Sequence, residues 1–232
     1  MSNKKNLITH FQNHGNQPHL DYKNFDLKPQ KNNNKMTALI YAFTYNASES
    51  LNLTTQQFDY LIEHCDLSII DDDGWNSLFC ALVFHKMENL NLNKQQFTYL
   101  IENSDLSQKT KFADNALTFS FSNNINEGYQ LDNQQFSTII EKMDFCNHKS
   151  RDLLLDTLCY FTDAPECMIH FSKFWLLFDN KDFLLSFIKD NNEFERLVPL
   201  LNHHSILSYE DKINLETIIS TKPNYNCSVQ KI

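Results

Sequence analysis

Apolar residues recur along the chain in the pattern of helices with one buried face. Phe58, Leu61 and Ile62 stand at positions i, i+3 and i+4, which places them on one side of a helix. At a constant interval of 39 residues the same stripe returns twice, as Phe97, Leu100 and Ile101 and then as Phe136, Ile139 and Ile140. A fixed interval of this length is typical of repeat proteins. The pattern therefore predicts three equivalent amphipathic helices.

Each of these helices is preceded by residues suited to start it. Three residues with a short side-chain oxygen are good N-caps, because that oxygen can accept a hydrogen bond from a free backbone N–H: Thr54, Asn93 and Asp132. Three residues further on, a glutamine completes a capping box in every copy: Gln57, Gln96 and Gln135. A leucine before each cap and a phenylalanine after each box fit a hydrophobic staple. The cap residue varies while its chemistry is kept, which indicates a true helix start.

A second helix is predicted at the beginning of each unit. Its N-caps are Thr37, Asn76 and Asn115, and each is followed by a leucine and, three residues later, by a small residue: Ala42, Ala81 and Ser120. The unit is then a turn, an inner helix, a loop and an outer helix. Ordering each backbone residue costs about 1–2 kcal/mol, while each large buried apolar side chain returns only about 1.5–3 kcal/mol. One unit is therefore unstable alone, and neighbouring units must stack.

Composition agrees with a helical protein. The 232 residues include only three glycines and five prolines, whereas an all-β fold needs turn residues every 8–12 positions. Hydrophobic residues make up 41% and charged residues 21%, which is ordinary for a globular chain. The predicted fold class is all-α, a helical-hairpin repeat solenoid.

The repeat resembles the ankyrin repeat. Residues 71–82 follow the turn and first helix of that family, D-x-x-G and then T-P-L-H-x-A-A, and residues 61–68 resemble the end of its second helix. The resemblance covers residues 32–148. The unit has 39 residues rather than about 33, and the Pro and His of the signature are missing from every copy. A different solenoid of helix pairs therefore stays open as an alternative.

The rest of the chain is organised around this array. Residues 1–31 form a basic Asn/Lys-rich segment or a partial capping repeat, and residues 32–148 hold three ankyrin-like repeats. We expect a degenerate fourth repeat at residues 149–179, a helical C-terminal cap at residues 180–220 and a frayed tail at residues 221–232.

Charge is distributed unevenly along the chain. The net charge is −9, yet residues 1–35 carry six lysines against two aspartates. The acidic remainder repels phosphate backbones, so we expect no nucleic-acid partner. The basic leader could contact an anionic surface, but the interpretation we favour is a solvated tail.

Cysteine usage and apolar runs bear on the compartment. The six cysteines include no Cys-x-x-Cys pair, which favours reduced thiols in a cytosol. No apolar run is long enough for a signal peptide or a membrane span. We therefore expect a cytoplasmic protein with no membrane span, and an exported form would use no recognisable Sec-type signal.

Candidate catalytic and metal-binding residues are few. Two groups match no zinc pattern: His10, His14 and His19, and Cys146, His148, Cys159 and Cys167. The pairs His64–Cys65 and Cys80–His85 do not face each other on a helix. Residues 71–73 lack the alternating acidic pattern of an EF-hand, and the chain contains no glycine-rich phosphate motif. We predict no metal, no cofactor and no catalytic residue, and therefore not an enzyme.

The resemblance also implies a binding surface. Ankyrin repeats bind proteins on their concave side, through the turn tips and the exposed end of the inner helix. Carried onto this sequence, those positions are Asn33, Asn34, Met36, Tyr45, Asp72, Asp73, Trp75, Val83, Phe84, Lys111, Phe112, Asp114 and Ser122. Trp75 is the strongest single candidate, because an exposed aromatic residue on a turn is a typical interface anchor. The alternative is that Trp75 and Phe84 cover their own repeat.

The leading hypothesis is a monomeric, non-catalytic module that binds a partner protein. One alternative is an enzyme with a site in the C-terminal third, near His170, His203 or His204. Another is a structural or inhibitory subunit that stays docked on one partner. Divergent ankyrin proteins abound in intracellular bacteria, and by that analogy the protein would be an effector delivered into a host cell.

Overall fold

The described part of the chain is mainly helical, which confirms the predicted all-α class. The structure is a computed structural model, and it describes residues 4–17, 19–29, 34–112, 114–121, 129 and 131–143. The predicted fourth repeat, C-terminal cap and tail lie outside these residues, as do Asn33 and Ser122.

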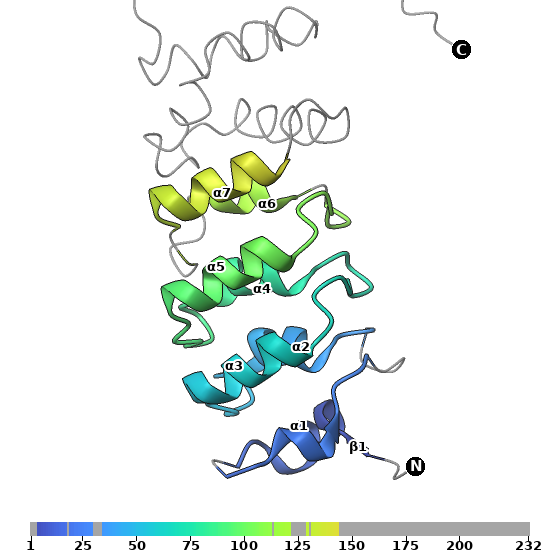
Figure 1. Cartoon of the computed structure of the whole chain (residues 1–232). Coiled ribbons are helices and arrows are strands. Elements are labelled where there is room, and N and C mark those ends of the chain that lie inside the picture. Colours follow the sequence, from blue (N-terminus) through green and yellow to red (C-terminus); the bar gives the residue numbers. More distant parts are fainter. Residues whose placement is uncertain are drawn as a thin grey trace, which may run out of the picture. The chain divides into compact units, whose positions relative to one another are not determined.

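Six of the helices form three pairs. The first pair is α2 (Ala38–Tyr45) and α3 (Thr55–His64), the second is α4 (Ser77–Phe84) and α5 (Lys94–Asn103), and the third is α6 (Ala116–Phe121) and α7 (Asn133–Met143). The pairs lie in layers in chain order (Figure 1). Helix α4 packs between α2 and α6, and α5 packs between α3 and α7, so helices at equivalent positions meet across each junction.

The inner helices start at the predicted caps. The Thr37 hydroxyl accepts from the N–H of Ile40 at 3.1 Å. The Asn76 side chain accepts from the N–H of Phe79 at 2.8 Å. In the third unit, Asn115 accepts from the N–H of Leu117 at 2.9 Å. Each bond satisfies a donor that the first helical turn leaves without a partner inside the helix.

The outer helices start with the predicted capping boxes. Gln57 Oε1 accepts from the N–H of Thr54, and Asn93 and Gln96 exchange bonds of 2.7 and 3.0 Å in the same way. Asp132 and Gln135 repeat the arrangement at 3.1 and 2.9 Å. The stripe behind each box is buried except for Ile140, which is half-buried, and the three phenylalanines 58, 97 and 136 are fully enclosed.

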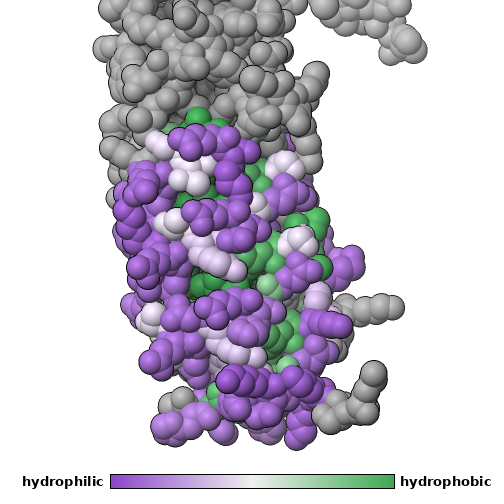
Figure 2. Space-filling view, in the orientation of Figure 1, coloured by the Kyte–Doolittle hydropathy of each residue, from purple (hydrophilic) through white to green (hydrophobic). Residues whose placement is uncertain are grey.

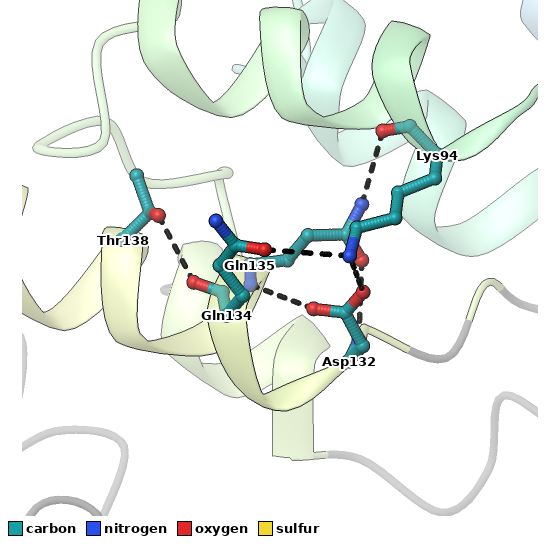
Figure 3. Close-up of polar contacts among 5 residues, drawn as sticks. All are labelled: Lys94, Asp132, Gln134, Gln135 and Thr138. Atoms are coloured by element: carbon teal, nitrogen blue, oxygen red, sulfur yellow. Dashed lines mark hydrogen bonds and ion pairs between the residues drawn. The ribbon is translucent and has the colours of Figure 1, made fainter.

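The same glutamines also join one unit to the preceding one. Gln96 Nε2 donates to the main-chain oxygen of Thr55 at 3.3 Å, and Gln135 Nε2 donates to that of Lys94 at 3.3 Å (Figure 3). Both acceptors are the first residue of the preceding outer helix. An amide can accept at its oxygen and donate at its nitrogen, whereas an ionised carboxylate only accepts. The second task therefore explains why these boxes contain Gln rather than Glu.

The loops between inner and outer helices form another junction. Asn46 Nδ2 donates to the main-chain oxygens of Glu88 and Asn89 at 2.9 and 3.3 Å. In the opposite direction, Glu88 Oε2 accepts from the N–H groups of Ala47 and Ser48 at 2.7 and 3.0 Å. Glu88 is only 6% exposed. The loops of the first and second helix pairs are thus bonded to each other in both directions.

The N-terminal segment is folded, which differs from the solvated tail that we favoured. Helix α1 (Leu7–His14) is capped by Asn6 and buries Leu7, Ile8 and Phe11. A 3₁₀ turn (Tyr22–Asn24) follows, and strands β1 (Lys5–Asn6) and β2 (Phe25–Asp26) pair in parallel. Helix α1 packs on α2, and the Phe11 ring stacks on Tyr41 at a centroid distance of 6.5 Å. The apolar face of α1 covers the first hairpin, which is why the segment folds.

Candidate interaction surface

The turns that precede inner helices α4 and α6 each have one polar side chain that accepts from backbone N–H groups of the turn. In the second unit, Asp71 Oδ1 accepts from the N–H groups of Asp73 and Trp75 at 2.9 and 2.8 Å. Burial raises the pKa of Asp71, although these two bonds work in the other direction. Thr110 occupies the equivalent position in the third unit and accepts from the N–H of Phe112 at 3.2 Å. The residues at the tips are therefore held in a defined conformation.

The tips of the three turns, at residues 34–35, 72–74 and 111–112, are bonded to one another along the chain order. The N–H of Asp72 donates to the oxygen of Asn34 at 3.0 Å, and the N–H of Lys111 donates to the oxygen of Asp73 at 2.9 Å. Ion pairs follow the same junctions, Lys35 with Asp72 at 2.6 Å and Lys111 with Asp73 at 2.5 Å. Exposed ion pairs contribute about 0–1 kcal/mol each, so the main-chain bonds define the geometry. Four predicted contact residues thus also link repeats.

Gly74 allows the second and third tips to approach closely. Its φ of +83° lies in the left-handed region, where a side chain is strained. A Cβ at this position would lie 2.7 Å from the main-chain oxygen of Lys109 and 3.0 Å from the Cα of Thr110. Both the backbone angle and the neighbouring turn therefore require glycine.

Trp75 connects two repeats through its ring. It stacks on Phe84 at a centroid distance of 5.7 Å and packs at a tilt against Phe119 of α6 at 5.2 Å. Phe119 also contacts Phe79 at 5.2 Å. Trp75 is only half-buried, so one part of it covers its own and the following unit and another part faces solvent. The contact with Phe119 was not predicted from the sequence, because nothing in the spacing of residues 75 and 119 indicates it.

Phe112 is the most exposed large apolar residue in the described part of the chain. Its relative exposure is 71%, and it lies on the third tip directly after Lys111. The ammonium of Lys111 lies 5.1 Å from the centre of the Phe112 ring. Exposing this much aromatic surface to water is unfavourable, and aromatic residues are enriched in protein interfaces.

The remaining predicted contact residues differ in accessibility. Tyr45 is half-buried and packs against Tyr41 at 4.8 Å, while Val83 and Asp114 are half-buried as well. Burial raises the pKa of Asp114. Met36 is only 8% exposed, so its side chain belongs to the core rather than to a contact surface. Alignment to a repeat gives the position of Met36 on the turn but not how deeply its side chain is covered.

The face that carries α3, α5 and α7 is predominantly hydrophilic, with apolar groups visible between successive helices (Figure 2). Tyr99 on α5 is an exception at 40% exposure. Phe112, at 71% exposure, is more accessible than this ring.

Several titratable side chains in the described residues are buried or packed against other side chains. Burial raises the pKa of the Cys65 thiol to about 12 and also raises that of Cys80. His64 Nδ1 lies 2.9 Å from the oxygen of Tyr60, and the His85 ring contacts Phe97 and Tyr129. Within the described ranges, no group of three His, Cys, Asp or Glu residues is placed to hold a metal ion.

Comparison of the chain with protein families, with curated proteins and with solved structures finds no match. None of the helices that the structure describes has the length and apolar character needed to cross a bilayer.

Proposed function

We propose that this chain is an ankyrin-like repeat solenoid that binds a partner protein through its concave face and turn tips, without catalysis of its own. Equivalent helices packed at intervals of 39 residues support the solenoid. Aromatic groups at the tips and along the inner helices support the binding surface. We place the protein in a cytoplasm, either that of the cell that makes it or that of a host cell that receives it.

The single observation that carries this proposal is Phe112. It is 71% exposed, yet its turn is fixed by the bond from Lys111 to Asp73 and by the bond from its own N–H to Thr110. An exposed aromatic ring on a fixed backbone binds with little loss of conformational entropy. This is the arrangement expected of an interface anchor rather than of a mobile loop.

The test compares two exposed aromatic residues on different faces. Phe112→Ala removes the candidate anchor, and Tyr99→Ala removes a ring from outer helix α5. Proteins captured by each variant are quantified by mass spectrometry, from lysates of the source cells and of host cells. We expect Phe112→Ala to weaken capture of the partner about thirtyfold, the factor given by a hot spot of about 2 kcal/mol, and Tyr99→Ala to leave it unchanged.

Equal capture by the wild type and by both variants would show that the tips are not the binding surface. Loss of capture with Tyr99→Ala alone would move the surface to the outer helices. The two alternative hypotheses give other results. A permanently docked subunit is poorly soluble when expressed alone. An enzyme loses turnover when His170, His203 or His204 is replaced, and these residues lie outside the described ones.

A further inference from the structure

The N-terminal segment presents a group of lysines on a folded support. Because β1 and β2 are paired, Lys5 lies opposite Phe25 at the usual strand separation of about 4.8 Å. Lys4 Nζ donates to the main-chain oxygen of Lys23 at 2.6 Å. Asn6 Nδ2 donates to the main-chain oxygen of Lys28 at 3.2 Å. Four lysines, all exposed, are thus gathered around one short pair of strands: Lys4, Lys5, Lys23 and Lys28. We call these four residues the lysine patch.

The two acidic residues near the patch accept hydrogen bonds from backbone N–H groups. Asp21 Oδ1 accepts from the N–H of Lys23 at 3.1 Å, and Asp26 Oδ1 accepts from the N–H of Lys28 at 3.1 Å. The ammonium group of Lys4 donates to the Lys23 oxygen, whereas Lys5, Lys23 and Lys28 carry theirs on exposed side chains. These carboxylates keep their charge, so the four lysines give the described residues from 4 to 29 a net charge of +2.

The charge of the remaining layers has the opposite sign. The described residues from 34 to 143 contain thirteen carboxylates and six lysines. Packed helices are about 8–10 Å apart, and the Debye length at physiological salt is about 8 Å. When a flat anionic surface meets the N-terminal layer (Figure 1), salt therefore screens its electrostatic repulsion by most of the acidic layers behind. A long polyanion such as a nucleic acid would extend past that layer and meet the acidic ones.

We propose that the lysine patch docks the chain on a membrane surface rich in anionic lipids, by way of the N-terminal layer. Charge complementarity favours an anionic partner, and a flat membrane surface avoids the acidic layers that an extended polyanion would meet. This docking is independent of the partner-binding surface, because the patch and Phe112 lie on different layers. The repeat units would then be held at the membrane with the turn tips accessible.

The test is sedimentation of the full chain with vesicles at physiological salt. Vesicles of phosphatidylcholine with about 30% phosphatidylserine should bind the protein, and pure phosphatidylcholine vesicles should not. The patch variant is Lys5→Gln, Lys23→Gln and Lys28→Gln combined. The control variant has the same net charge and is Lys86→Gln, Lys94→Gln and Lys109→Gln combined. Each lysine near an anionic surface contributes about fivefold to binding, so the patch variant should lose affinity on the order of a hundredfold.

Helical content and the urea midpoint, measured for both variants, separate loss of binding from loss of folding. Raising the salt concentration should release the wild type from the vesicles. Equal loss in the two variants, equal binding to both kinds of vesicle, or no binding to either would overturn the proposal. Binding to a DNA or RNA duplex without binding to vesicles would also overturn it, in favour of a nucleic-acid partner. None of these outcomes depends on whether Phe112→Ala affects protein capture.

Discussion

Gln96 holds two helical hairpins together with one amide group. Its oxygen accepts from the N–H of Asn93 at 2.7 Å, and its nitrogen lies 3.3 Å from the main-chain oxygen of Thr55 in the preceding unit. The same nitrogen lies 2.7 Å from Oδ1 of Asp59. The capping of one helix and the contact with its neighbour are therefore the work of a single buried side chain.

Gln96→Glu should destabilise the protein by about 1–3 kcal/mol, the usual cost of a lost buried hydrogen-bond donor. The new carboxylate would also face Asp59 and the Thr55 oxygen. Urea denaturation measures the change. Gln95→Glu, the same substitution at the exposed neighbouring position, should cost less than about 0.5 kcal/mol. The difference between the variants should shrink near pH 4, because a protonated carboxyl group can donate again. Equal stability of the two variants would contradict the proposed role.

Gly74→Ala should cost more than the strain of its backbone angle alone. Gly15 is the matched control, because its φ is also positive, at +65°, while a Cβ there would meet nothing within 4 Å. We expect Gly15→Ala to cost about 1–3 kcal/mol, as is usual for a side chain in a strained backbone region. Gly74→Ala should cost at least about 1 kcal/mol more in urea denaturation, because the methyl group would contact the main chain of Lys109. A smaller effect at Gly74 than at Gly15 would mean that the two turns do not approach closely.

Trp75 and Phe112 should separate folding from binding. Trp75→Ala removes the ring contacts with Phe84 and Phe119 and should lower the free energy of unfolding by about 2–3 kcal/mol. Phe112→Ala removes an exposed ring and should change it by less than about 0.5 kcal/mol. Thermal unfolding followed by circular dichroism measures both. Phe112 is consequently the better probe of a partner, and a large loss of stability on its truncation would remove it from the proposed surface.

The buried thiols give a pH-dependent prediction. Burial raises the pKa of Cys65 to about 12, compared with about 8.5 in an unfolded chain. Its contribution to stability is therefore complete below about pH 8.5 and is lost as the pH rises toward 12, with a slope of about 1.4 kcal/mol per pH unit. Cys65→Ala should show a shallower alkaline loss of stability than the wild type.

The same burial predicts slow alkylation. At about pH 8, iodoacetamide should leave the peptides that contain Cys65 and Cys80 unmodified in the native protein and should label them in concentrated guanidinium chloride. The digest is read by mass spectrometry. Equal labelling under both conditions would contradict the burial of these side chains.

Local features of the fold were predictable from the sequence, and contacts between distant residues were not. The cap at Asn93 and the box at Gln96 depend on residues three positions apart, which a spacing argument captures. The second bond of Gln96 reaches Thr55, and no spacing rule indicates it. Helix α1 was missed because its buried residues Leu7, Ile8 and Phe11 stand among polar neighbours, and the covering hairpin becomes apparent only in the folded chain.

The candidate surface was predictable to a smaller extent. Alignment of the units placed Asn34, Asp72, Asp73 and Lys111 in turns, and in the structure these residues lie in turns that bond to one another. Alignment gives no information about what lies across a junction. It therefore did not predict that Met36 is buried, or that Trp75 is partly covered by a ring 44 positions further along the chain.

The acceptor of each glutamine bond is a carbonyl of the peptide backbone, which all twenty amino acids possess. Positions 55 and 94 can therefore change identity without loss of the bond, as Thr and Lys already illustrate. An additional copy of the unit, inserted between two others, could donate from its glutamine to the preceding unit and offer a backbone oxygen to the glutamine of the following one. Growth or shortening of the array by whole units then requires no compensating substitution in the neighbours at this junction.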